Sequence, residues 1–108
     1  MSTSPVINSS VEDLSVAYEE NGQLIVKELD KVILSKGAWA TVMFRYQQWE
    51  EAKSDFGTEK YAIRRYRKVG GEYKMQSKFV ISSPAQAQKI VETLAGWLED
   101  APEASADS

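Results

Sequence analysis

The sequence predicts an α+β fold, in which an antiparallel sheet of four or more strands is followed by one C-terminal helix. Two observations lead to this prediction. Between residues 14 and 82, apolar side chains mostly alternate with polar ones, as they do along strands with one buried face. After residue 83 the apolar side chains recur every three or four residues, which is typical of an amphipathic helix. Strands that precede a helix in this way form an α+β domain.

Length and composition indicate one domain. A chain of 108 residues has the length of an ordinary domain, and 43% hydrophobic and 27% charged residues are typical of a globular protein. The two ends are rich in Ser, Ala and Pro and poor in large apolar side chains. We therefore expect a flexible tail at 1–10, a domain over 11–100 with an N-terminal hairpin extension, and an acidic flexible tail at 101–108.

The first predicted element is a hairpin. Residues 14–18 and 23–27 favour strands and flank Asn21-Gly22, a pair that tolerates the positive φ angles of a tight hairpin turn. A short helix within 12–20 is the alternative. Residues 31–36 then predict a separate short strand that ends at Gly37.

Three further strands are expected. Residues 39–50 have an apolar side with Val42, Phe44 and Tyr46, and an opposite side that carries Trp39, Thr41, Met43, Arg45, Gln47 and Trp49. After a loop at 53–58, residues 59–68 and 72–82 flank a glycine turn. Strict alternation gives the first of these strands an apolar side with Tyr61 and Ile63 and an opposite side with Lys60, Arg64, Tyr66 and Lys68. It gives the second strand a side with Lys74, Gln76, Lys78 and Val80.

The helix is predicted over residues 84–99. Ser83 is placed to be its N-cap, Pro84 takes the first helical position, and Gln86 completes a capping-box pattern. One helix covers a sheet only partly, so we expect a homodimer, with Trp97 in the core or at the dimer interface. The predicted interface residues are Leu94, Trp97 and Leu98.

The composition argues against an enzyme. The chain has no cysteine and no histidine, which removes thiolate and imidazole chemistry and the usual ligands of zinc. We interpret the carboxylates at 50–59 as solvated, and we expect no cofactor and no metal. No apolar run approaches the ~20 residues that a membrane span needs, and no signal peptide is evident.

Positive charge is concentrated in the middle of an acidic chain. The net charge is −3, yet residues 36–83 hold ten basic and five acidic side chains, and seven of the ten lie within 59–83. Cations bind phosphates, and aromatic rings stack on unpaired bases, so this pattern predicts binding of single-stranded nucleic acid. A solvated basic face without a ligand is the alternative. The predicted nucleic-acid-binding residues are Arg45, Trp49, Lys60, Arg64, Tyr66, Lys68, Lys74 and Lys78.

Several short motifs follow one another over residues 61–94. They are Ile63-Arg64-Arg65-Tyr66, Gly71-Glu72-Tyr73-Lys74, Lys78, and Ser83-Pro84-Ala85-Gln86. In this order and spacing they resemble the C-terminal domain of the transcriptional positive cofactor four family, and the strand at 40–49 resembles that family more loosely. Two departures are Gln76-Ser77-Lys78-Phe79, where the family usually has a Gly-Lys-Gly-like sequence, and Arg67, where it often has an aromatic residue.

The resemblance implies a dimer of curved antiparallel sheets, each followed by a helix, that binds single-stranded DNA along basic strands. It suggests Arg64, Lys74 and Lys78 as phosphate contacts, with Arg45 and Trp49 contributing from the adjoining strand. We therefore expect a sequence-tolerant single-stranded DNA-binding protein, coactivator-like, that acts in transcription regulation, replication, recombination or repair; RNA is an alternative ligand. The alternative function is a protein-interaction module that binds an acidic partner. The expected location is the cytoplasm or nucleoid, the host cytoplasm for a viral protein, or the nucleus for a eukaryotic one.

Overall fold

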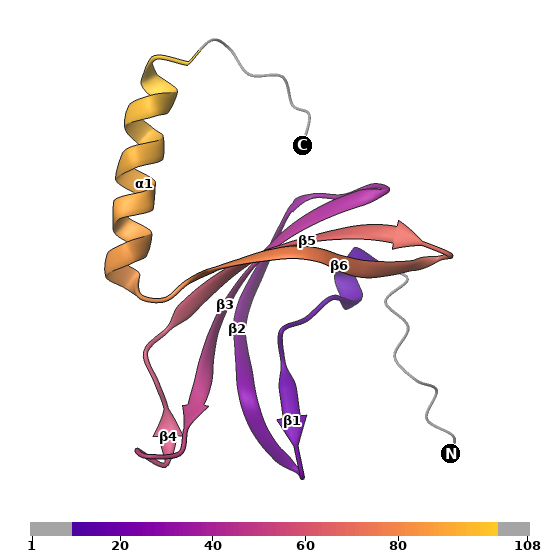
Figure 1. Ribbon diagram of the computed structural model, residues 1–108, viewed down its shortest axis with the longest axis vertical. Helices are drawn as coiled ribbons and strands as arrows, with labels where there is room; N and C mark the ends of the chain where they lie inside the picture. Colours follow the sequence, from indigo (N-terminus) through magenta and orange to yellow (C-terminus); the bar gives the residue numbers. More distant parts are fainter. Residues whose placement is uncertain (1–9, 102–108) are drawn as a thin grey trace.

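The chain forms an antiparallel sheet followed by one helix, which confirms the predicted α+β fold (Figure 1). The computed structural model describes residues 10–101, so the predicted tails lie outside the described residues except for Ser10 and Ala101. In chain order the elements are η1 (Val11–Asp13), β1 (Tyr18–Glu20), β2 (Gln23–Ser35), β3 (Trp39–Glu50), β4 (Asp55–Phe56), β5 (Lys60–Val69), β6 (Glu72–Ile81) and α1 (Pro84–Glu99).

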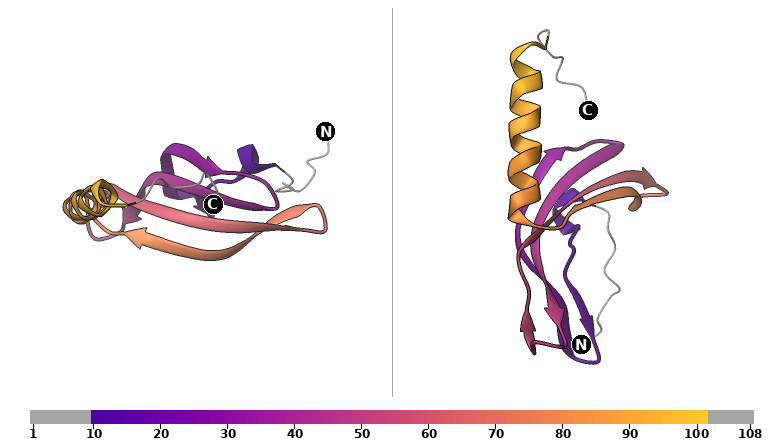
Figure 2. Two further views of the ribbon diagram at one scale, coloured as in Figure 1. Left: turned by 90° about the horizontal axis from the view of Figure 1, so that it is seen from above. Right: turned by 60° about the vertical axis from the view of Figure 1, so that its left-hand side comes forward.

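The strands lie in the order β1-β2-β3-β5-β6, and the short β4 pairs with the end of β3 within the predicted loop. β2 is one strand of 13 residues, so the separate strand predicted at 31–36 is wrong. Its register against β3 shifts between Glu28 and Asp30 and again between Ile33 and Ser35. Such bulges interrupt the alternation of side chains but let the pairing continue, and they bend the sheet. Figure 2 shows the resulting curvature.

Two glycine-containing turns are confirmed. Asn21 and Gly22 have φ angles of 51° and 80° between β1 and β2, and Gly70 and Gly71 have 60° and 84° between β5 and β6. Positive φ at both central residues is the feature of the two-residue turns that match the twist of antiparallel strands. The two hairpins are therefore set by local chemistry.

Two faces of the sheet can be distinguished. The core face carries Ala40, Val42 and Phe44 of β3, which are almost fully buried, and the outer face carries Trp39, Thr41 and Met43. Residues opposite one another on paired strands share a face, so Ala62 and Tyr66 of β5 extend the core face. Both are also buried.

The segment 10–17 packs on the core face and is not a strand, so the hairpin strand predicted at 14–18 is wrong except at its last residue. Val11, Leu14 and Val16 are 3%, 1% and 5% exposed and belong to the core cluster. The ammonium group of Lys31 donates to the carbonyl oxygens of Glu12 and Leu14 at 2.7 and 2.8 Å. The segment thus seals part of the core face and we call it the strap.

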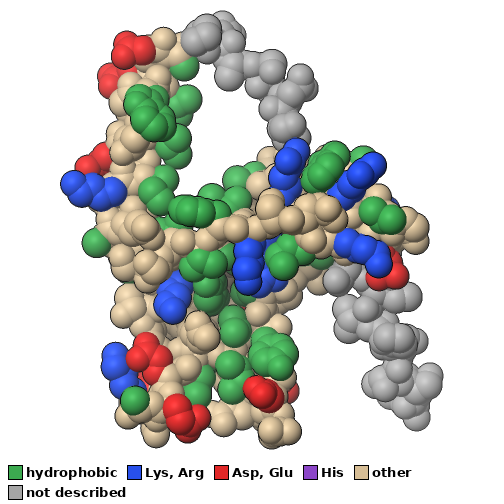
Figure 3. All heavy atoms as spheres, in the orientation of Figure 1, with side chains coloured by type: hydrophobic (Ala, Val, Ile, Leu, Met, Phe, Trp, Pro, Cys, Tyr) green, Lys and Arg blue, Asp and Glu red, His purple; other side chains and the backbone are tan. Residues whose placement is uncertain are grey.

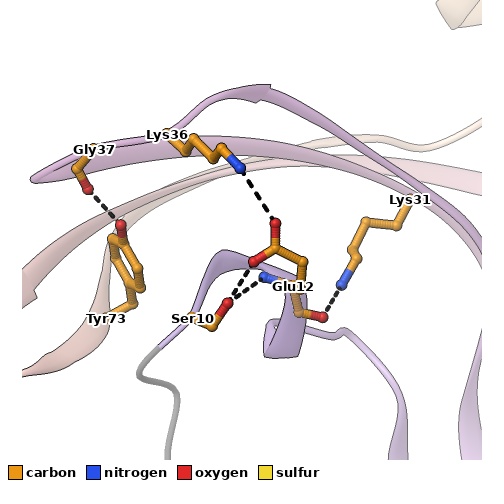
Figure 4. A network of polar contacts seen from close by, with 6 residues as sticks. All are labelled: Ser10, Glu12, Lys31, Lys36, Gly37 and Tyr73. Atoms are coloured by element: carbon orange, nitrogen blue, oxygen red, sulfur yellow. Dashed lines mark hydrogen bonds and ion pairs between the residues drawn. The ribbon is translucent and has the colours of Figure 1, made fainter.

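Polar contacts hold the beginning of the strap (Figure 4). Ser10 caps the η1 turn, and the carboxylate of Glu12 accepts from the Ser10 hydroxyl and lies 3.4 Å from the ammonium nitrogen of Lys36. The Ser10 hydroxyl, a backbone N–H and Lys36 together lower the pKa of Glu12 to about 2. Nearby, the hydroxyl of Tyr73 donates to the carbonyl oxygen of Gly37.

The helix has the predicted bounds but does not lie on the sheet. It leaves the end of β6 and projects away from the strands, and none of its residues is buried (Figures 1 and 2). The predicted N-cap is confirmed, because the Ser83 hydroxyl accepts from the backbone N–H of Gln86 at 3.2 Å. The reciprocal bond of a capping box is displaced by one residue, because the side-chain oxygen of Gln86 accepts from the backbone N–H of Ser82 at 2.9 Å. Trp97 is 70% exposed, so it is not part of the protomer's core. Among residues 10–101 no helix is long and apolar enough to cross a membrane.

Candidate nucleic-acid interface

The predicted basic residues do not share one face of the sheet. Arg64 of β5 pairs with Val42 of β3 and with Lys78 of β6. Val42 lies on the core face and paired residues share a face, so Arg64 and Lys78 are also on the core face. Arg45 lies opposite Tyr61, out of phase with Val42, and is therefore on the outer face. The predicted binding residues therefore do not form a single basic surface. The core face carries Lys60, Arg64, Tyr66, Lys68 and Lys78, and the outer face carries Arg45, Trp49 and Lys74.

A bulge in β6 explains why Lys74 and Lys78 separate. Arg65 pairs with Ser77 whereas Tyr66 pairs with Met75, so Gln76 is an extra residue without its own partner on β5. A bulge of this kind reverses the alternation beyond it. Lys74 and Lys78 are four residues apart and would share a face in a regular strand. The bulge turns them to opposite faces.

Arg64 lies between two grooves of the core face. The first, of about 200 Å³, is lined by Val16, Tyr46, Gln48, Lys78 and other residues of the strap, β2, β5 and β6. The second, of about 430 Å³, is lined on one side by the strap and on the other by Tyr66, Tyr73 and Met75. A ligand in either groove would meet the guanidinium of Arg64.

The surroundings of Arg64 leave hydrogen-bond donors unused. Its guanidinium carbon lies 5.8 Å from the centre of the Phe44 ring, and its Nε is buried without a hydrogen-bond partner among the described residues. Burial raises the pKa of the Tyr46 hydroxyl, and the positive charge of Arg64 opposes that rise. A guanidinium has five N–H donors, so an anion in the adjoining grooves could be bound by several of them.

Most of the cations on β5 and β6 lack an acidic partner. Within residues 10–101, no ion pair involves Lys60, Arg64, Lys68 or Lys78. Arg45 differs, because one of its terminal nitrogens lies 3.3 Å from a carboxylate oxygen of Glu59. Figure 3 shows basic side chains gathered along β5 and β6, and acidic ones near the end of the sheet where β1 and β4 lie. The unpaired cations are the ones available to an anionic ligand.

The two aromatic rings predicted to stack on bases are engaged within the protein. Tyr66 is 4% exposed and belongs to the core cluster. Trp49 packs edge-to-face on Phe56, with ring centres 5.3 Å apart and an angle of 81° between the rings. Its indole nitrogen is buried without a hydrogen-bond partner in the described part of the chain. Neither ring is placed as a free stacking platform.

The outer face holds a basic cluster that the sequence analysis missed. The guanidinium carbons of Arg65 and Arg67 lie 4.3 and 5.5 Å from the centre of the Trp39 ring, and Lys74 pairs with Arg67 from the neighbouring strand. Alternation along β5 places Arg65 and Arg67 on the side of Ile63, which had been interpreted as apolar. The positive charges of Arg65 and Arg67 could have indicated this cluster, but neither residue was included among the predicted binding residues.

No family model, curated protein or solved structure matches this chain. The resemblance to positive cofactor four is therefore still a prediction. Among the described residues, no three acidic side chains are grouped so that they could hold a metal ion.

Proposed function

We propose that the protein binds single-stranded nucleic acid, with DNA as the first ligand, through the cations of β5 and β6. The observation that carries this proposal is the cross-strand pair of Arg64 and Lys78, which borders a groove of about 200 Å³. Neither cation has an acidic partner within residues 10–101. Binding of phosphates at such a pair releases counterions and does not depend on base sequence. A sequence-tolerant role in transcription regulation, replication, recombination or repair follows from such binding.

The groove beside the pair favours an unpaired strand. Tyr46 and Val80 offer apolar surface within it, and Gln48 offers a side-chain amide that forms no hydrogen bond with the described residues. Bases in a duplex are stacked and paired, so only an unpaired base could reach these side chains while its phosphates contact Arg64 and Lys78.

Binding of labelled oligonucleotides tests the proposal. Single-stranded and duplex forms of one sequence are titrated at about 50 mM and about 200 mM salt. We expect tighter binding of the single strand, and Arg64→Ala or Lys78→Ala should each reduce the log–log salt slope by about 0.7. Lys53→Ala is the matched control, because Lys53 is already paired with Glu50 at 3.5 Å. Equal affinity for duplex, or unchanged slopes in folded variants, contradicts the proposal.

An acidic protein partner is the second candidate function. The observation in its favour is that Trp49 and Tyr66 pack within the protein, which leaves the core face with charge but with few free rings. An acidic peptide would use the same cations without any need for stacking. This function predicts that a poly-glutamate peptide displaces an oligonucleotide of equal charge at equal concentration.

We also propose that two copies associate through α1. Leu94, Trp97 and Leu98 are 48%, 70% and 64% exposed, and Leu94 and Trp97 help to line an apolar groove of about 310 Å³. Monomeric proteins rarely leave an apolar surface of this kind uncovered. Antiparallel pairing of two helices about Leu94 would place Lys89 of one copy opposite Glu99 of the other, so the charges favour this arrangement. Figure 3 shows the hydrophobic side chains along one side of the helix.

A further inference from the structure

Positive charge lies on both faces of the β5–β6 hairpin. The core face carries Arg64 and Lys78, while the outer face carries a group that we call the outer cluster. Its members are Trp39, Arg65, Arg67 and Lys74. Arg65, Arg67 and Lys74 are exposed, and their side chains form no ion pair or hydrogen bond with any residue in the range 10–101; the Gln76 amide donates only to the backbone carbonyl oxygen of Lys74. No acidic side chain of the described residues neutralises their charge.

We propose that the outer cluster is a second phosphate-binding surface, and that one nucleic-acid strand passes over the edge of β6 to contact both faces. This inference rests on the proposed function, and it concerns the path of the strand. The core-face pair would bind one part of the strand. The outer cluster would bind phosphates further along the same strand.

The geometry of β6 supports a path over its edge. β6 is the last strand of the sheet order, so its outer edge has no neighbouring strand within residues 10–101. Lys78 and Lys74 lie on this edge strand and point to opposite faces because of the bulge at Gln76. Four residues of strand span about 13 Å, so Lys74 and Lys78 are about 13 Å apart along β6 and on opposite faces of it. A nucleic-acid strand that passes over the edge between them has only a short distance to travel. Glu72, beside the turn, is the one acidic residue of β6.

The ring of Trp39 restricts the two arginine side chains of the outer cluster before an anion binds. It lies under two guanidinium groups, at 4.3 and 5.5 Å from their central carbons. A cation over an aromatic ring is attracted to it, which restricts the arginine side chains before any ligand binds. Restricted side chains lose less entropy on binding, so the same phosphate contact is more favourable. The guanidinium N–H donors of Arg65 and Arg67 form no hydrogen bond or ion pair with the described residues and remain free for phosphate oxygens.

The first experiment compares the two faces. Arg65→Gln/Arg67→Gln and Arg64→Gln/Lys78→Gln are titrated with a single strand of about 25 nucleotides, longer than a typical binding site. We expect each double variant to lower the log–log salt slope by about 1.4. A fourfold rise in salt concentration should then reduce the affinity of each variant for the strand by a factor about sevenfold smaller than the factor for the original protein. Arg65→Lys/Arg67→Lys should keep the slope, and Lys53→Gln should leave it unchanged.

The thermal midpoint of each variant is measured as the control for correct folding. If Arg65→Gln/Arg67→Gln unfolds, Lys74→Gln serves instead, because the side chain of Lys74 is exposed and makes no contact with an acidic residue in the described chain. That variant should lower the slope by about 0.7. An outer-cluster variant that is folded and binds with an unchanged slope overturns the inference, while loss of binding in Arg64→Gln/Lys78→Gln would leave the proposed function intact. Failure of the original protein to bind any single strand refutes the proposed function itself.

The second experiment tests the crossing. The chain has no cysteine, so Gln76→Cys can be labelled at one position with a bulky maleimide. The label should weaken binding of the strand of about 25 nucleotides but have little effect on one of about 3 nucleotides, whose phosphates, about 3.4 Å apart, span less than the roughly 13 Å between Lys74 and Lys78. Glu51→Cys, labelled in the same way, is the control in an exposed turn away from β6. If the label has no effect and two long strands bind per protomer, the faces bind separate strands and the crossing is wrong.

Discussion

The burial of Leu14 gives a direct test of the strap. Leu14 is 1% exposed and lies among the core side chains under the sheet, although it belongs to no strand. Leu14→Ala removes three carbon atoms, worth about 2.4 kcal/mol at about 0.8 kcal/mol per buried methylene. The cavity left behind brings the expected loss in the free energy of unfolding to about 3–5 kcal/mol.

Leu34→Ala is the matched control for this prediction. It removes the same atoms from a strand residue that is 54% exposed, so we expect a loss of less than about 1 kcal/mol. Urea unfolding followed by tryptophan fluorescence measures both values, at one protein concentration because an oligomer's stability depends on it. If the two variants lose the same stability within about 0.5 kcal/mol, the strap does not pack on the core face and the reasoning is refuted.

Three further predictions concern a turn, a carboxylate and the helix. Gly71→Ala should destabilise by about 1–2 kcal/mol because φ is +84° there, whereas Gly96→Ala, in a helix with open space around it, should stabilise by up to about 1 kcal/mol; thermal midpoints decide. The hydroxyl of Ser10 and neighbouring donors lower the pKa of Glu12 from 4.5 to about 2, so its contribution to stability is present above pH 4.5 and is lost as the pH falls towards 2. The difference in midpoint between the original protein and Glu12→Gln should therefore shrink over that interval, and a constant difference contradicts the interpretation. Trp97→Ala should convert a dimer into a monomer in sedimentation, and a monomeric original protein would rule out the proposed association.

Local signals in the sequence identified the turns and the helix. Asn21-Gly22 and Gly70-Gly71 tolerate positive φ angles, and Ser83 caps a helix whose first residue is Pro84. Each of these preferences depends on a few adjacent residues and needs no knowledge of the rest of the chain. The order of strands followed by a helix was predictable for the same reason.

The face of the sheet on which each side chain lies was not predictable, because it depends on how the strands pair. Four register shifts, one between β1 and β2, two between β2 and β3 and one between β5 and β6, break the strict alternation predicted from the sequence. An extra residue such as Gln76 is recognised only when the partner strand is known. The error affected the site directly, since it placed Lys74 and Lys78 on one surface and left Arg65 and Arg67 on an apolar one.

The positions of the charged residues along the chain were enough to show that positive charge is concentrated on two successive strands, and local propensity showed that those strands form a hairpin. The pairing and packing of the strands set which cations face the grooves, which face outward, and which rings are already packed. The tertiary structure also placed Leu14 in the core and the helix away from the sheet. The physical reason is that charge and turn preference belong to individual residues, whereas burial and facing depend on contacts between segments far apart in the chain.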